Sequence, residues 1–122
     1  MPQNATTILV IDDDESVGVI LRRALKSYDV ALALSAEEAL NIVSMQAFDG
    51  ILCDLTLPGD SGATFLRKVA ALRPGQELRV RFMTGGATDE DTLALVAEHP
   101  EAVIHKPFEI EHLRRFVADL VA

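Results

Sequence analysis

Short apolar runs alternate along this chain with segments whose apolar residues recur at helical spacing. The runs have the length of strands and are apolar almost throughout, and they fall at residues 8–11, 30–34, 50–55, 80–83 and 102–104. In the segments that follow them, apolar residues lie three or four positions apart, which predicts amphipathic helices. The pattern therefore predicts a strand followed by a helix, five times over.

Polar residues mark the beginnings of several predicted helices. Ser35 and Glu38 have the spacing of a capping box just before an apolar stripe, so a helix is predicted to begin there. Thr88 is predicted to cap the fourth helix by accepting a hydrogen bond from a backbone amide. The third helix is predicted to bury one apolar stripe, Phe65, Leu66, Val69 and Leu72.

Strands that are apolar throughout are typical of a parallel sheet covered by helices on both faces. Five strand–helix units with right-handed crossovers predict a doubly wound α/β domain of the flavodoxin-like kind, with a five-stranded sheet between two layers of helices. The usual strand order for such a domain is 2-1-3-4-5. In that order, the crevice at the carboxyl ends of the strands lies beside the first and third strands.

Composition limits the functions open to this chain. At 122 residues it is long enough for one domain, and an apolar fraction of 49% indicates a packed globule. The net charge of −8 disfavours direct binding to nucleic acid or to an anionic membrane. The chain has a single cysteine, Cys53, and no membrane-length apolar stretch or signal sequence, which favours the reducing cytoplasm. We expect one domain over residues 1–122, with no output domain.

Four of the five predicted strands end in polar residues. Asp12 and Asp13 follow the first strand, Asp54 lies at the end of the third, Thr84 follows the fourth and Lys106 follows the fifth. Because the carboxyl ends of parallel strands share one edge of the sheet, these three carboxylates, one hydroxyl and one ammonium are predicted to converge. The negative charges of Asp12 and Asp13 would repel that of Asp54 unless a cation lay between them. These aspartates are therefore predicted to form a cation-binding site and not simply to face solvent.

Four short motifs in a fixed order carry a resemblance to a known family. They are Ile11-Asp12-Asp13, the segment 53–59 with sequence CDLTLPG, Thr84-Gly85, and Lys106-Pro107-Phe108. Together they resemble the receiver domains of two-component response regulators over nearly the whole chain. The resemblance implies that Asp54 accepts a phosphoryl group from the phosphohistidine of a sensor histidine kinase or a histidine phosphotransfer protein. It also implies autodephosphorylation and a change in contacts with a downstream protein partner.

The residue types suit phosphoryl transfer assisted by Mg²⁺. Mg²⁺ prefers oxygen ligands and retains several waters, so Asp13, Asp54 and the backbone carbonyl of Thr56 are expected to bind it, with Asp12 acting mainly through water. Lys106 is expected to place a positive charge beside the phosphoryl group. Thr84 is expected to donate a hydrogen bond to that group once it is attached.

One position departs from the family pattern and leaves an alternative open. Many receivers carry a tyrosine or phenylalanine three residues before the lysine, where this chain has Val103. A signal is then expected to pass through the Gly85-Gly86 loop and the fourth helix. The alternative function is a receiver-like protein-interaction module that is not phosphorylated. The missing aromatic also favours a phosphate shuttle or the receiver of a hybrid histidine kinase over a free-standing regulator.

Two other classes of protein fit the residues less well. A haloacid-dehalogenase-like phosphatase needs a second carboxylate two residues after its nucleophile, where this chain has Thr56. A flavodoxin-like flavin carrier needs a phosphate-binding first loop, and the acidic Asp12, Asp13 and Asp14 would repel the flavin phosphate. The three histidines lack metal-ligand spacing and are predicted to lie at the surface, and Cys53 is predicted to be a buried, unreactive thiol.

Overall fold

The computed structural model of the chain describes residues 5–57, 59, 61–85 and 90–122. The strands are β1 Thr7–Ile11, β2 Asp29–Ala33, β3 Gly50–Asp54, β4 Val80–Thr84 and β5 Val103–His105. The helices are α1 Glu15–Ala24, α2 Ala36–Met45, α3 Gly62–Leu72, α4 Glu90–Glu98 and α5 Ile110–Val121. Two short 3₁₀ helices, η1 Gln76–Arg79 and η2 Pro100–Ala102, lead into β4 and β5.

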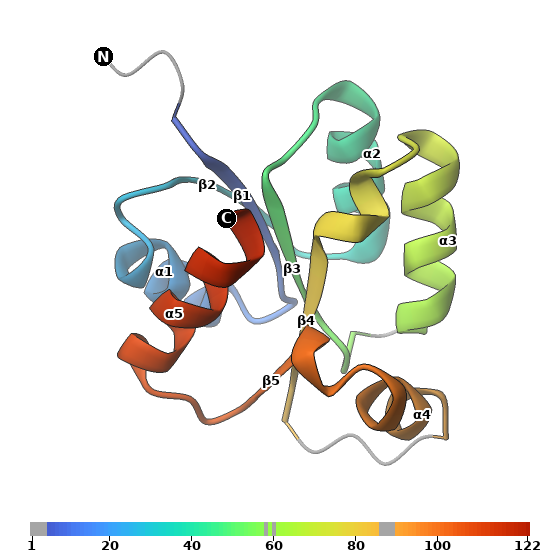
Figure 1. Cartoon of the computed structure of the whole chain (residues 1–122). Coiled ribbons are helices and arrows are strands. Elements are labelled where there is room, and N and C mark those ends of the chain that lie inside the picture. The colour runs from blue at the N-terminus through green and yellow to red at the C-terminus, as the bar shows by residue number, and fades with distance from the viewer. Residues whose placement is uncertain (1–4, 58, 60, 86–89) are drawn as a thin grey trace.

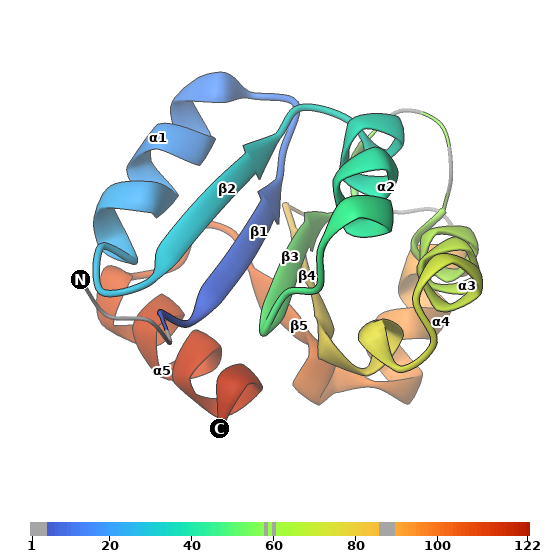
Figure 2. The same ribbon diagram turned by 90° about the horizontal axis from the view of Figure 1, so that it is seen from above.

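All five strands run parallel, in the order β2-β1-β3-β4-β5. Figure 2 shows them side by side, with β1 between β2 and β3. In the register, Ile8 lies opposite Val30 on one side and Gly50 on the other, and Phe82 of β4 lies opposite Val103 of β5. The predicted doubly wound α/β fold with strand order 2-1-3-4-5 is therefore confirmed.

Helices cover both faces of the sheet, as the apolar strands predicted. Helices α1 and α5 lie on one face, and α2, α3 and α4 lie on the other (Figure 1, Figure 2). Each strand divides its side chains between the two layers: in β1, Ile8 and Val10 join the cluster under α1 and α5, whereas Leu9 and Ile11 join the opposite cluster. The two buried clusters fix the sheet and its carboxyl edge between them.

Side-chain caps fix the starts of three helices near that edge. The carboxylate of Asp14 accepts a hydrogen bond from Ser16 N, and Ser61 Oγ accepts one from Thr64 N. At α2, Ser35 Oγ accepts from Glu38 N at 3.1 Å, which confirms the predicted cap. Glu38 Oε2 accepts in return from the backbone N–H of the residue before the cap, so the reciprocal bond lies one residue earlier than in a standard capping box.

Some predicted details differ from the structure. Leu72 was predicted to be buried but is 47% exposed, because it lies in the last turn of α3, where the helix borders an open cavity. The second strand ends at Ala33, and Leu34 beyond it is 46% exposed. The predicted cap Thr88 lies outside the described residues.

The described α-helices are short. They run from 9 residues in α4 to 12 in α5, whereas a helix needs about 20 apolar residues to cross a bilayer. Within the part of the chain that the structure describes, no helix could span a membrane.

Candidate functional site

The sheet brings the predicted site residues to one edge. Asp12 follows β1, Asp54 and Thr84 are the last residues of β3 and β4, and Lys106 follows β5. Backbone hydrogen bonds continue the ladder past the strand ends, from Asp12 N to Ala33 O at 3.1 Å and from Lys106 N to Thr84 O at 2.7 Å. The positions of the side chains are therefore set by the rigid sheet, as the sequence predicted.

Three carboxylates form the centre of the site. One oxygen from each of Asp12, Asp13 and Asp54 lies within 4.8 Å of the others. Asp12 and Asp54 are each 3% exposed, whereas Asp13 is open to solvent. A donor set made only of oxygens, with one face toward water, fits a hard cation such as Mg²⁺ that keeps part of its hydration shell.

Lys106 connects two of these carboxylates. Its Nζ lies 3.0 Å from Asp12 Oδ2 and 3.3 Å from Asp54 Oδ2, and its side chain is 25% exposed. A buried carboxylate needs such a partner, because transfer of a charge from water into the protein is costly. One ammonium beside three carboxylates still leaves the cluster with an excess of negative charge.

Burial and ion pairing have opposite effects on the pKa values of Asp12 and Lys106. Burial raises the pKa of the Asp12 carboxyl, and the hydrogen bonds from Asp14 N–H and Lys106 counter it only in part. For Lys106, burial disfavours the charged amine, but the hydrogen bond to Asp12 and the charges of Asp54 and Asp12 outweigh it, so the pKa of Lys106 is raised. Lys106 therefore stays protonated at neutral pH.

Thr56 also holds Asp54, through both its backbone and its side chain. Thr56 N–H and Thr56 Oγ1 both donate to Asp54 Oδ1, at 2.9 and 2.8 Å. The resemblance implied that the backbone carbonyl of Thr56 binds the metal, but the hydrogen bond from its hydroxyl to Asp54 was not predicted. An aspartate often accepts hydrogen bonds from the residue two positions later in a local turn. The spacing of Asp54 and Thr56 could therefore have indicated these bonds.

The fourth and fifth strands supply the remaining predicted features. Thr84 is 3% exposed at the end of β4. Val103 is 6% exposed and lies in register beside Phe82, which is 1% exposed. The aromatic ring in this part of the sheet therefore comes from β4 and not from β5. Gly86, predicted to relay a signal, lies outside the described residues.

Cys53 and the histidines remain apart from this chemistry, as predicted. Cys53 is 4% exposed, and burial together with the charges of Asp54 and Asp12 raises the pKa of its thiol. His99, His105 and His112 are exposed to solvent. In the described residues, the acidic cluster is the one group of carboxylates, histidines and cysteines arranged to hold a metal ion.

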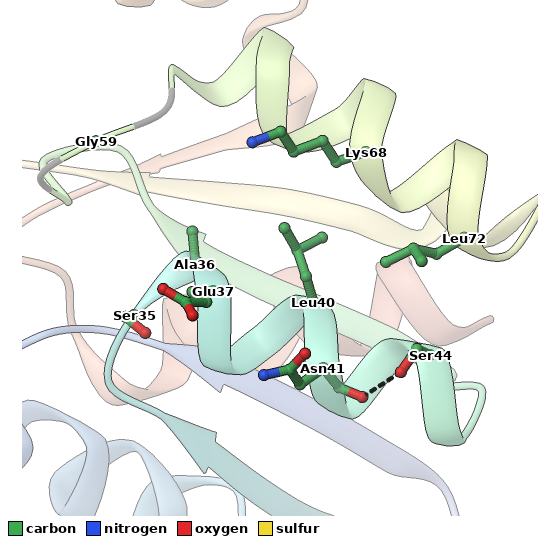
Figure 3. Close-up of a pocket in the computed structure, with 9 residues that line it drawn as sticks. All are labelled: Ser35, Ala36, Glu37, Leu40, Asn41, Ser44, Gly59, Lys68 and Leu72. Carbon is green, nitrogen blue, oxygen red and sulfur yellow. Dashed lines mark hydrogen bonds between the residues drawn. The ribbon is translucent and has the colours of Figure 1, made fainter.

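One cavity lies apart from the carboxylates. It has a volume of about 690 Å³ and lies between α2 and α3 (Figure 3). Leu40 from α2 and Lys68 and Leu72 from α3 border it, and Figure 3 shows Ser44 Oγ bonded to the carbonyl of Asn41 at its rim. None of the three clustered aspartates lines this cavity.

A smaller, more apolar cavity of about 440 Å³ adjoins the site. Its walls come from α1 and from the segment that joins β5 to α5, and they include Lys106, Pro107 and Phe108. Lys106 belongs both to the lining of this cavity and to the acidic cluster, so the cavity and the cluster are neighbours.

Comparison with models of protein families identifies the family of this chain. The model for the response regulator receiver domain matches residues 8–118, which include every strand end described above. The chain belongs to this family. The receiver domain's strand order and acidic edge are those described here, so the resemblance carried by the four motifs is confirmed.

Known relatives agree with this assignment. The chain is 33% identical over 116 residues to the transcriptional regulatory protein ZraR of Escherichia coli strain K12, a match that covers 93% of this chain and 26% of ZraR. A CheY-like receiver domain protein from Methanospirillum hungatei is 27% identical, with a TM-score of 0.82 over 97% of this chain and 94% of that one. This receiver therefore spans about a quarter of the length of the curated regulator.

A third relative is a response regulator protein from Burkholderia pseudomallei, whose structure contains a phosphorylated aspartic acid, a calcium ion and citrate. It is 29% identical, with a TM-score of 0.73 over 92% of this chain and 66% of that one. A response regulator similar to this chain therefore carries phosphate on an aspartate.

Proposed function

We propose that Asp54 of this receiver accepts a phosphoryl group from a phosphohistidine, with Mg²⁺ held by the acidic cluster, and that the modification switches contacts with other proteins. The observation that carries the proposal is the convergence of Asp12, Asp13 and Asp54 within 4.8 Å, with Lys106 between two of them. Such a cluster is costly for a fold to maintain without a cation to bind.

Each residue has a distinct part in the proposed reaction. Asp54 is the nucleophile: one of its oxygens bonds to phosphorus while the bond from phosphorus to the donor imidazole breaks, leaving the electron pair on nitrogen. Asp13, Asp54 and the Thr56 carbonyl would hold the metal, with Asp12 acting mainly through water. The bound metal would neutralise charge on the phosphoryl oxygens. Lys106 would contribute a second positive charge.

Thr84 would report the change to the rest of the domain. Its position at the end of β4 is next to Lys106, whose backbone N–H bonds to the Thr84 carbonyl at 2.7 Å. Phosphorylation adds roughly −1.5 to −2 charge at neutral pH, which attracts hydroxyl donors. A hydrogen bond from Thr84 to the phosphoryl group would draw the loop after β4 toward Asp54 and so move the start of α4.

The relatives support this proposal by their chemistry and their names. The Burkholderia protein carries its phosphate on an aspartic acid, and a divalent ion is present in the same structure. ZraR is named as a transcriptional regulator, so a receiver of this kind can belong to a protein that acts on transcription. For this chain we propose a histidine kinase or a histidine phosphotransfer protein as the phosphoryl donor and a second protein as the downstream partner.

Phosphorylation is tested most directly by mass. The protein is incubated with Mg²⁺ and acetyl phosphate, and its intact mass is recorded beside an Asp54→Asn control that keeps the shape of the side chain. We expect a gain of one phosphoryl group that is absent when Mg²⁺ is omitted and absent in the control.

The same measurement separates this function from the alternative. A folded protein that gains no mass in any condition would indicate a receiver-like interaction module that is not phosphorylated. Val103 is the observation that favours that alternative, because it gives β5 no aromatic ring to respond to Thr84. A gain that persists in Asp54→Asn would place the modification on another residue.

A further inference from the structure

The cavity between α2 and α3 has walls of opposite charge. Glu37 lies on the α2 wall and Lys68 on the α3 wall, and both residues are exposed to solvent. Figure 3 shows the Lys68 side chain extending toward the end of the cavity where Glu37 lies. The cavity therefore has an acidic side and a basic side at the same end.

A leucine follows each of these charges at helical spacing. Leu40 lies three residues after Glu37 on α2, and Leu72 lies four residues after Lys68 on α3. Residues three or four apart share one face of a helix, so each wall presents first a charge and then a leucine. Leu40 is partly buried, and Leu72 is 47% exposed. This face of the molecule therefore leaves apolar surface in contact with water, which favours its burial against a partner.

The pattern makes the face complementary to a second copy of itself. Helices α2 and α3 run along the cavity in the same direction (Figure 3). A two-fold axis parallel to both helices would place α3 of one copy over α2 of the other without shifting either along its length. Glu37 of each copy would then meet Lys68 of the other, and Leu40 would meet Leu72. A two-fold axis across the helices would instead place α2 over α2, where the charges do not pair.

We propose that this chain forms a symmetric dimer through the α2–α3 face, the surface around the cavity that carries Glu37, Leu40, Lys68 and Leu72. Two ion pairs at the surface and two leucine pairs make a small interface, so the dimer is weak and depends on protein concentration. Lys68 also has an interaction within its own chain. Its ammonium has three donors, so it can add a partner's carboxylate to that interaction.

This dimer goes beyond the proposed function and does not depend on it. None of the clustered residues Asp12, Asp13 and Asp54 lines the cavity between α2 and α3. The acidic edge of each copy is therefore expected to stay open to a phosphoryl donor. Association can be measured without Mg²⁺ and without any phosphodonor, so its outcome is separate from the test of phosphorylation.

Sedimentation equilibrium of the unmodified protein measures the association. The protein is studied from about 5 µM to about 500 µM, the range in which a small interface becomes populated. We expect the average mass to rise with concentration from the 13.2 kDa of one chain toward twice that value. A mass of one chain at every concentration would overturn the proposal and leave the face to a different protein.

Reversal of each charge tests which walls meet. Glu37→Lys would give the face only positive charges, and Lys68→Glu would give it only negative charges. We expect each variant to raise the dissociation constant of the dimer at least about tenfold, because two attractive pairs become two repulsive ones. The matched control is Glu15→Lys, which reverses an exposed acidic residue in the first turn of α1, on the opposite face of the sheet.

The control is expected to dimerise within about twofold of the unmodified protein. Dimers of Glu37→Lys and Lys68→Glu as tight as that of the unmodified protein would place the interface elsewhere and overturn the proposal. Both substituted residues are exposed, so neither change should prevent folding, and circular dichroism verifies this for each variant.

A second variant tests the apolar part of the face. Leu72→Ser removes a half-exposed side chain that each copy would bury against Leu40 of the other. We expect the dissociation constant to rise at least about tenfold, because two leucines lose an apolar partner. An unchanged constant would overturn the pairing of Leu40 with Leu72 and with it the proposed two-fold arrangement.

A mixture of the two charge-reversal variants separates pairing between copies from a role within one chain. In a dimer of Glu37→Lys with Lys68→Glu, each positive wall meets a negative wall. The mixture is therefore expected to associate within about twofold of the unmodified protein, although each variant alone does not. If Glu37 and Lys68 acted only within their own chain, mixing would restore nothing, and that result would overturn the proposal.

Discussion

Lys106 and Asp12 are 94 positions apart in the sequence and form an ion pair of 3.0 Å at the edge of the sheet. Asp12 is almost fully buried, whereas the Lys106 side chain is 25% exposed. The ammonium reaches inward from the end of β5 and also approaches Asp54. In the absence of a metal, Lys106 is thus the positive charge that balances two buried carboxylates.

Replacement of Lys106 by methionine should destabilise the protein most when no metal is present. Without the ammonium, Asp12 and Asp54 would repel each other in a buried site, and we expect the free energy of unfolding to fall by about 1–3 kcal/mol. Added Mg²⁺ should recover part of this loss, because it supplies charge to the same carboxylates. Urea denaturation with and without Mg²⁺ measures both effects.

The matched control for this variant is Lys26→Met, which removes an exposed lysine distant from the site. We expect it to change the free energy of unfolding by less than about 0.5 kcal/mol in either buffer. An equal loss for Lys106→Met with and without Mg²⁺ would show that Lys106 stabilises the fold by packing alone.

Asp12 gives a prediction about pH. The pKa of its carboxyl is raised in the folded protein, so ionised Asp12 lowers stability at neutral pH, and the stability that its protonated form contributes is lost as the pH rises through the folded pKa. In metal-free buffer at pH 7, Asp12→Asn should therefore raise the free energy of unfolding by on the order of 1 kcal/mol. The advantage should shrink as the pH falls toward 3.8, the ordinary value for an aspartate.

Thermal denaturation of both proteins between pH 4 and pH 7 measures this difference. A constant gap across that range would mean that the substitution acts through packing and not through the charge of Asp12. A less stable Asp12→Asn at pH 7 would mean that the ion pair with Lys106 outweighs the cost of burial.

Much of the fold and the site was predictable because most site residues lie at or just after the end of an apolar run. Asp54 comes after four buried residues of β3, and the parallel arrangement of such strands fixes where the chain must place it. Asp12 follows β1 for the same reason. The order of the strands then brings the two residues together, so local pattern and topology sufficed for the carboxylates.

Other features depend on contacts between residues far apart in the sequence, which the pattern of neighbouring residues does not reveal. Leu72 has helical spacing with the buried residues of α3 but lies beside the cavity between α2 and α3, and so it is exposed (Figure 3). Gln76 is a polar residue that begins the short helix η1, yet it is only 5% exposed. Its hydrogen-bond partner, Phe48, lies 28 residues earlier, so no short segment of the sequence could indicate the contact.

Gln76 is predicted to be one of the most sensitive polar positions outside the site. Its Oε1 accepts from Phe48 N–H at 2.8 Å and its Nε2 donates to Phe48 O at 2.9 Å, which ties η1 to the segment before β3. Gln76→Leu would leave both backbone groups buried without partners, at a cost of about 2–4 kcal/mol.

Gln46→Leu provides the comparison, because Gln46 is exposed at the end of α2. We expect it to alter the free energy of unfolding by less than about 0.5 kcal/mol. Urea denaturation of the two variants measures the contrast. Similar values for Gln76→Leu and Gln46→Leu would mean that water replaces the lost amide at Phe48.

The thiol of Cys53 should be unreactive in the folded protein although Cys53 directly precedes Asp54. Its sulfur is buried, and burial together with the charges of Asp54 and Asp12 raises the pKa of the thiol, so the reactive thiolate is scarce even in mildly alkaline buffer. We expect a thiol-reactive disulfide reagent to label the folded protein at least about 100-fold more slowly than the urea-unfolded protein. Labelling should follow the unfolding transition in urea, because the thiol becomes accessible only when the chain unfolds. Rapid labelling of the folded protein, absent in Cys53→Ala, would show that β3 opens locally beside Asp54.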